Sequence, residues 1–127
     1  MFKYCNAHPR QLNVDDCVKR AIVLTTGMDY MEVQRGLNAH KKITGAKKFN
    51  SDDNPRSYVE KVLGAKRIRF IKEEGKAQMT GADFCNKFGI GKYILSMPEH
   101  WTACIDGVIC DTWDCSELVV YSCFIMD

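Results

Sequence analysis

The chain has 127 residues, of which 46% are hydrophobic and 27% are charged, a composition typical of one globular domain, residues 1–127, with one hydrophobic core. Lys and Arg number 18 against 16 Asp and Glu, so the formal charge of +2 provides no strong field that would attract a nucleic acid or an anionic membrane. We therefore expect neither as a partner. The function has to come from a local site.

The N-terminal residues lack the apolar core of a signal peptide, and no run reaches the roughly 18 apolar residues of a membrane span, so we expect a cytoplasmic protein. The seven cysteines are an odd number, which favours reduced thiols over a disulfide framework. Structural zinc is the other interpretation, but four residues separate Cys110 from Cys115 and there is no Cys-x-x-Cys pair. We expect no metal and no cofactor.

In chain order, residues 1–16 predict an irregular lead-in, because they contain Pro9, Asn13 and two aspartates. A helix is predicted next, with Asp16 as its N-cap, Cys17 as its first residue and Gly27 as its end. Residues 21–24 leave this helix almost no polar face. The helix is therefore expected to be buried, with only its N-terminal tip in water.

A second, amphipathic helix is predicted after Asp29, since Glu32 completes a capping box. The polar connection over 40–53 is either a solvated loop or a binding patch. A third helix is predicted from Asn54 to Gly64, and a short strand over 66–71 with Arg67 and Arg69 facing outward. The last helix is expected between Thr80 and Gly89.

From residue 91 onward the pattern is that of strands, over 91–98, 100–105, 108–113 and 118–126. Asp106-Gly107 between two such runs is a strong hairpin signal. Helices first and an antiparallel sheet last predict an α+β fold. Counting outward from this turn pairs Thr102 with Asp111 and puts His100 diagonally across from Asp111 on the same face.

This arrangement suggests nucleophilic catalysis. Cys17 at a helix start lies at the positive end of the helix dipole, which stabilises a thiolate. His100 is the candidate base, and Asp111 can fix its tautomer, whereas Asp114 is on the wrong face and Asp106 is in the turn. The plain alternative is a small core cysteine, a histidine at a strand end and a solvated carboxylate.

The order of Cys17, His100 and Asp111-Thr112-Trp113 resembles the papain-like cysteine peptidase superfamily. In that superfamily a cysteine begins a buried central helix that packs on an antiparallel sheet. Gln11 precedes Cys17 by six positions, as the oxyanion-hole glutamine does in papain-like peptidases, and Gln-x-x-x-x-Asp-Cys is similar to bacteriocin-exporter peptidase domains. Trp113 corresponds to the tryptophan that shields the histidine from water. Small phage and prophage papain-fold proteins are also similar, which would imply the cytoplasm of a bacterial host.

The resemblance implies a thiol hydrolase that cleaves a peptide or isopeptide bond of a protein substrate through a thioester. The backbone N–H of Cys17 and the Gln11 amide would stabilise the oxyanion. An acyltransferase or transglutaminase would use the same triad. A catalytically silent module that binds a protein is the strongest rival. A nucleic-acid binder is a third alternative, based on the cations Lys41, Lys42, Lys47, Lys48, Lys66, Arg67 and Arg69.

Overall fold

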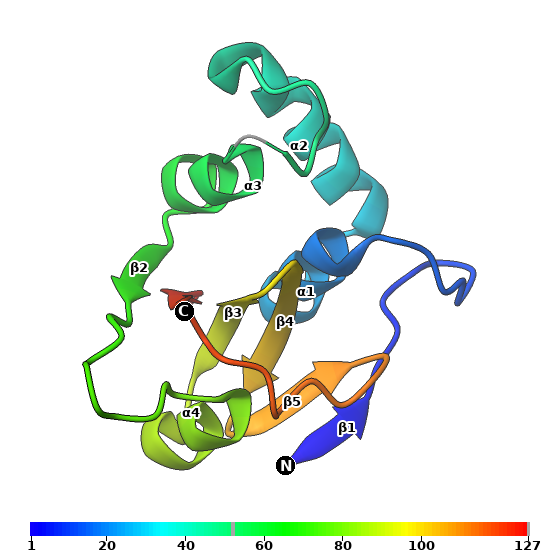
Figure 1. Cartoon of the computed structure of the whole chain (residues 1–127). Helices are drawn as coiled ribbons and strands as arrows, with labels where there is room; N and C mark the ends of the chain where they lie inside the picture. Colours follow the sequence, from blue (N-terminus) through cyan, green and yellow to red (C-terminus); the bar gives the residue numbers. More distant parts are fainter. Residues whose placement is uncertain (52, 127) are drawn as a thin grey trace.

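The computed structural model describes residues 1–51 and 53–126, and Figure 1 shows their arrangement. The α+β class predicted from the sequence is confirmed, with four α-helices, one π-helical segment and one six-stranded sheet in these residues. In chain order the elements are β1 (Phe2–Tyr4), α1 (Cys17–Thr26), α2 (Tyr30–Thr44), α3 (Asn54–Ser57), η1 (Tyr58–Val62), β2 (Lys66–Arg69), α4 (Gly81–Phe88), β3 (Lys92–Met97), β4 (His100–Ile105), β5 (Val108–Asp111) and β6 (Ser122–Ile125).

The sheet has the strand order β1-β5-β4-β3-β6-β2, and it is mixed, which corrects the expectation of a purely antiparallel sheet. The exception is β1, which pairs in parallel with β5 at one edge. The prediction that residues 1–16 are irregular throughout is therefore wrong. Three residues of the lead-in form β1, because the exposed edge of β5 offers them unpaired backbone groups.

Two hydrophobic clusters cover the two faces of this sheet. Ile94 and Phe124 point to the face covered by α1, α2 and the α3–η1 segment, where Ile22 and Leu37 are fully buried. The neighbouring residue Leu95 points to the other face, covered by α4. This arrangement follows from the alternation of side chains along a strand. It confirms that α1 is a buried helix.

The connection between α2 and α3 is shorter than predicted, because α2 continues through residues 40–44 to Thr44. Asn54 lies at the C-terminal end of this connection. Its buried carboxamide donates hydrogen bonds to the backbone carbonyls of Leu37 (3.0 Å) and Phe49 (2.6 Å). Asp52, which falls in the predicted connection, lies outside the described residues. The connection is thus held against α2 by a buried amide.

The third predicted helix forms, but after Ser57 it continues as the π-helical turn η1. The strand predicted over 66–71 is also present as β2, with one reversal. Ile68 is 37% exposed, whereas Arg67 is half-buried opposite Phe124. The prediction that Arg67 faces outward is wrong, because the alternation of polar and apolar residues does not fix which face of an edge strand is covered.

Of the helices formed by residues 1–51 and 53–126, none combines the length and the apolar character needed to cross a membrane.

Candidate active site

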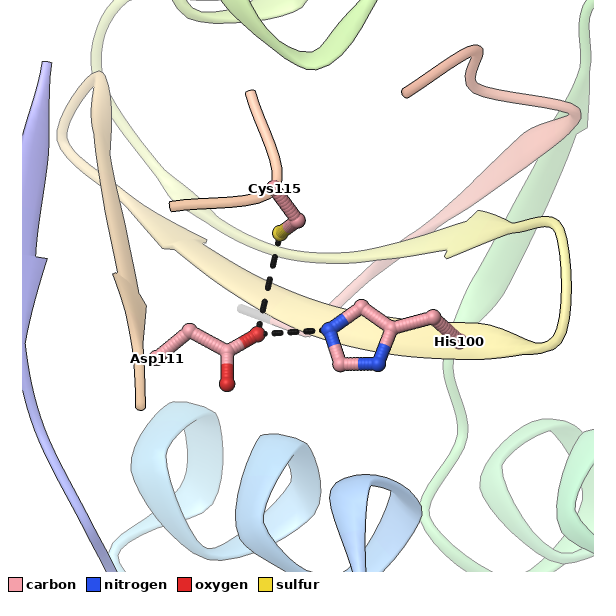
Figure 2. A group of neighbouring side chains, drawn as sticks. All are labelled: His100, Asp111 and Cys115. Atoms are coloured by element: carbon pink, nitrogen blue, oxygen red, sulfur yellow. Dashed lines mark hydrogen bonds and ion pairs between the residues drawn. The ribbon is translucent and has the colours of Figure 1, made fainter. Parts of the chain in front are cut away.

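The β4–β5 hairpin brings His100 and Asp111 together. Asp106 and Gly107 both have positive φ, 49° and 77°, as a two-residue type I′ turn requires. The register pairs Ile105 with Val108, as predicted, and the strands end with Nε2 of His100 2.7 Å from Oδ2 of Asp111. Figure 2 shows this contact. The turn therefore decides which carboxylate meets the imidazole.

The carboxylate of Asp111 is buried and fully engaged. Its Oδ2 also accepts a hydrogen bond from the Thr102 hydroxyl (2.6 Å), and its Oδ1 accepts one from the Thr112 backbone N–H (2.7 Å). Burial alone raises the pKa of this carboxyl group, but the hydrogen bonds from His100, Thr102 and Thr112 outweigh it and hold the pKa below the ordinary value. Asp111 is therefore a fixed anion at neutral pH.

His100 is held between this anion and two thiols. Its side chain is 9% exposed. Burial alone lowers the pKa of the imidazole, but hydrogen bonds with Asp111, Cys115 and Cys17 raise the pKa to about 11. The imidazole is therefore protonated across the neutral range, as an acid that donates a proton to a leaving group has to be.

Cys17 is half-buried and is the first residue of α1, as predicted from the sequence. Together with His100 it lines a cavity of about 400 Å³. Within the residues that the structure describes, no group accepts a hydrogen bond from the backbone N–H of Cys17. The thiol, the imidazole and an unpaired N–H group thus meet at the N-terminus of α1.

The expected side-chain cap of this helix is not present. Asp16 occupies the N-cap position, but its carboxylate makes no hydrogen bond to the first turn. It is 2% exposed and pairs instead with the Arg20 guanidinium, and it accepts a hydrogen bond from the Tyr30 hydroxyl (2.8 Å). Because these partners satisfy the Asp16 charge, its opposition to an anion at Cys17 is reduced.

Sequence reasoning missed Arg20. This buried side chain lies one turn after Cys17, and its guanidinium contacts both Asp16 and, at 3.5 Å, Oδ1 of Asp111. A buried arginine between two carboxylates is indicated only weakly by sequence. The available signal was the i+4 position of this cation relative to Asp16.

Cys115 is the second residue that was missed. Its thiol lies 3.7 Å from Oδ2 of Asp111, and Figure 2 shows the Cys115 sulfur and the His100 ring both directed at this carboxylate oxygen. The atoms of His100, Asp111 and Cys115 that could coordinate a metal ion all lie within 4.8 Å of one another. This set includes ligand types that suit zinc, but it supplies three of the four ligands that a structural zinc site takes.

Gln11 is not where the resemblance implies. It is exposed and adopts a φ of 57°. Its side-chain NH2 group donates hydrogen bonds to the backbone carbonyls of Asn6 (2.9 Å) and His8 (3.0 Å). It is also not among the residues that line the cavity beside Cys17. The expectation that its amide points at an oxyanion is corrected: the tight turn of the lead-in occupies that amide instead.

Trp113 lies against the imidazole, as expected of a shielding residue. The two ring centroids are 4.9 Å apart and the rings are tilted by 46°. The indole is 47% exposed, so it covers His100 from the solvent side. Trp101, by contrast, packs on Phe124 at 5.0 Å and belongs to the core.

No protein-family model matches this chain, and neither a curated protein nor a solved structure matches it. The site is therefore interpreted from its own geometry: a thiol at a helix start, a protonated imidazole and a buried carboxylate from one hairpin.

Proposed function

We propose that the protein is a cysteine-dependent hydrolase of amide bonds, acting on a peptide or isopeptide bond of a protein substrate. Cys17 is the nucleophile, His100 the general acid and base, and Asp111 the residue that orients the imidazole. The observation that carries this proposal is that a single imidazole interacts with a thiol at the start of α1 and with a buried carboxylate.

In the proposed reaction the Cys17 sulfur, as a thiolate, attacks the carbonyl carbon and forms a C–S bond. The backbone N–H of Cys17 stabilises the oxyanion, in place of the Gln11 amide. The C–N bond then breaks as the His100 imidazolium gives its proton to the leaving amine. Water, deprotonated by the now neutral His100, attacks the thioester carbon, and the C–S bond breaks to release the carboxylic acid and restore the Cys17 thiolate beside the His100 imidazolium.

The papain-like resemblance belongs to this proposal. The buried helix α1 begins at Cys17 and packs on a sheet that carries His100 and Asp111 in that order, which supports it. The relation to small phage proteins, and with it a location in the cytoplasm of a bacterial host, is likewise proposed from the sequence motifs alone.

Alkylation with iodoacetamide tests the nucleophile, and Cys5 provides a matched control. Both thiols are half-buried, whereas the other five are buried. We expect Cys17 to be modified at mildly acidic pH, at least about tenfold faster than Cys5, because a thiolate reacts and a thiol does not. Mass spectrometry of the digested protein locates the label. Equal rates and equal pH profiles for the two thiols would refute the proposal.

Acylation with p-nitrophenyl acetate separates the remaining alternatives. A hydrolase forms an acetyl thioester at Cys17, releases p-nitrophenolate, and returns to the free thiol as water attacks. An acyltransferase keeps the thioester until an amine such as glycine ethyl ester is added. A silent binding module acylates no faster than its Cys17→Ser variant does. Intact-mass measurements over time distinguish these outcomes.

A further inference from the structure

The cavity beside Cys17 extends across four neighbouring strands. It is lined by His100 and Trp101 of β4, Ser96 of β3, Ser122 of β6 and Arg67 of β2. These strands are consecutive in the sheet order β4-β3-β6-β2. Neighbouring strands are about 4.8 Å apart, so the cavity reaches about 14 Å from the His100 strand to the Arg67 strand.

Arg67 is the unusual residue of this cavity. Its Cα pairs with that of Phe124, so its side chain shares the face on which Phe124 is buried. Its Nε atom is buried and has no hydrogen-bond partner, and in the part of the chain that the structure describes no carboxylate forms an ion pair with it. Removing water from a buried hydrogen-bond donor costs free energy, and here no protein partner compensates that cost.

The surroundings of Arg67 compensate its charge only in part. Burial first, and then the nearby cations Arg56 and Arg69, lower the pKa of this guanidinium, and the nearby carboxylates Glu60 and Asp53 offset that effect only in part. Arg56 is itself occupied, with carboxylate contacts to Asp53 (3.9 Å) and Glu60 (3.5 Å). An additional anion would therefore be bound by Arg67.

Three carboxylates also line the cavity, and all of them are solvated. Asp15 and Glu99 are exposed, and the Asp53 side chain is 74% exposed beside Arg56. Solvent screens the exposed carboxylates, so they interact only weakly with a ligand in the cavity. The half-buried Arg67 is screened less and interacts more strongly with a group that contacts it. The rim is therefore acidic, and the deeper charge is positive.

We propose that Arg67 binds a carboxylate of the substrate, about four residues away from the bond that Cys17 attacks. This inference rests on the proposed function of Cys17. The spacing follows from the roughly 14 Å between the strands and the rise of about 3.3 Å per residue in an extended peptide. The carboxylate either ends the peptide chain or belongs to an acidic side chain. A two-point contact with Nε and an Nη atom requires a rotation of the Arg67 side chain, a change common on binding.

Iodoacetyl peptides test the inference, because the iodoacetyl group alkylates Cys17 while the rest of the probe reaches along the cavity. Iodoacetyl-Gly-Gly-Gly has a terminal carboxylate, and its C-terminal amide is the neutral match. Iodoacetyl-Gly-Gly-Glu-amide carries the carboxylate on a side chain instead. A charged hydrogen bond to Arg67 should make one of the two anionic probes about tenfold faster than the neutral one at low probe concentration.

The variants Arg67→Gln and Arg67→Lys complete the test. Arg67→Gln should reduce the advantage of the anionic probe to less than about twofold, and Arg67→Lys should retain part of it, because the charge remains. Arg69→Gln is the matched control, since Arg69 lies on the same strand outside this cavity and should keep the full advantage. Circular dichroism and thermal unfolding confirm that each variant is folded.

The outcomes separate this inference from the proposed function. If Cys17 is no faster than Cys5 toward iodoacetamide itself, the proposed function fails. If Cys17 reacts rapidly but the charged and neutral probes react equally, or if the advantage survives in Arg67→Gln, only the inference about Arg67 fails. An advantage confined to one anionic probe identifies the source of the carboxylate, a chain terminus or an acidic side chain.

Discussion

Arg20 and Asp111 are 91 positions apart in the sequence, yet Nη2 of the guanidinium lies 3.5 Å from Oδ1 of the carboxylate. The same guanidinium pairs with Asp16, the residue before Cys17. One buried cation thus connects the start of the nucleophile helix to the carboxylate that orients the imidazole. It fixes the position of α1 relative to the β4–β5 hairpin.

Replacing the Arg20 cation should make the protein less stable. Arg20→Met keeps the approximate volume but leaves two buried carboxylates short of a partner, which should lower the free energy of unfolding by about 3–5 kcal/mol. Chemical denaturation measures the loss. Arg56→Met is the control: its ion pairs are solvated, so the change should stay within about 1 kcal/mol. Equal losses in the two variants would contradict the role given to Arg20.

The stability should depend on pH through His100. The folded-state pKa of about 11 lies above the unfolded value near 6.5, so the stabilisation is fully present below about pH 6.5 and is lost as the pH rises toward 11. The free energy of unfolding should fall by up to about 1.4 kcal/mol per pH unit in this window. The difference between the wild type and His100→Gln isolates this residue, because His8 and His40 are common to both. A difference that does not change between pH 6.5 and 9 would rule out the raised pKa.

Removing the charge of Asp111 should lower the pKa of His100. In Asp111→Asn the side chain keeps its size but loses the anion that contributes most to raising this pKa. Nuclear magnetic resonance of the imidazole C–H groups follows the titration directly. In the wild type the His100 signal should remain that of an imidazolium through neutral pH, and in the variant it should titrate at lower pH. The His40 signals serve as a reference, since that ring hydrogen-bonds Ser57 in a different part of the fold. Identical His100 curves in the two proteins would show that Asp111 does not control the imidazole.

Trp113 should affect the reactivity of Cys17 more than stability. Its indole covers the imidazole at a centroid distance of 4.9 Å while remaining half-exposed, so Trp113→Ala admits water to the hydrogen bond between His100 and Asp111. We expect iodoacetamide to label Cys17 several-fold more slowly, with a change of less than about 1.5 kcal/mol in the free energy of unfolding. Trp113→Phe keeps an aromatic cover and should restore most of the rate. If both variants label at the wild-type rate, the indole has no shielding role.

Local chemistry in the sequence determined the parts of the site that depend on neighbouring residues. Asp106-Gly107 fixed the turn, the turn fixed the register, and the register selected Asp111 as the partner of His100. The predicted start of α1 at Cys17 is also confirmed, although Asp16 makes no side-chain hydrogen bond to the first turn. These predictions were accurate because turn geometry and helix ends depend on a few consecutive residues.

The tertiary structure alone decided the long-range contacts. The pairing of β1 with β5, the buried Arg20 between two carboxylates and the inward orientation of Arg67 each join segments that the sequence leaves far apart. Gln11 is an example of a wrong prediction from a sequence motif. Its amide hydrogen-bonds carbonyls of its own loop and does not point at the predicted oxyanion site. A buried charge is placed by whatever partners the fold brings within reach, and no local pattern encodes that choice.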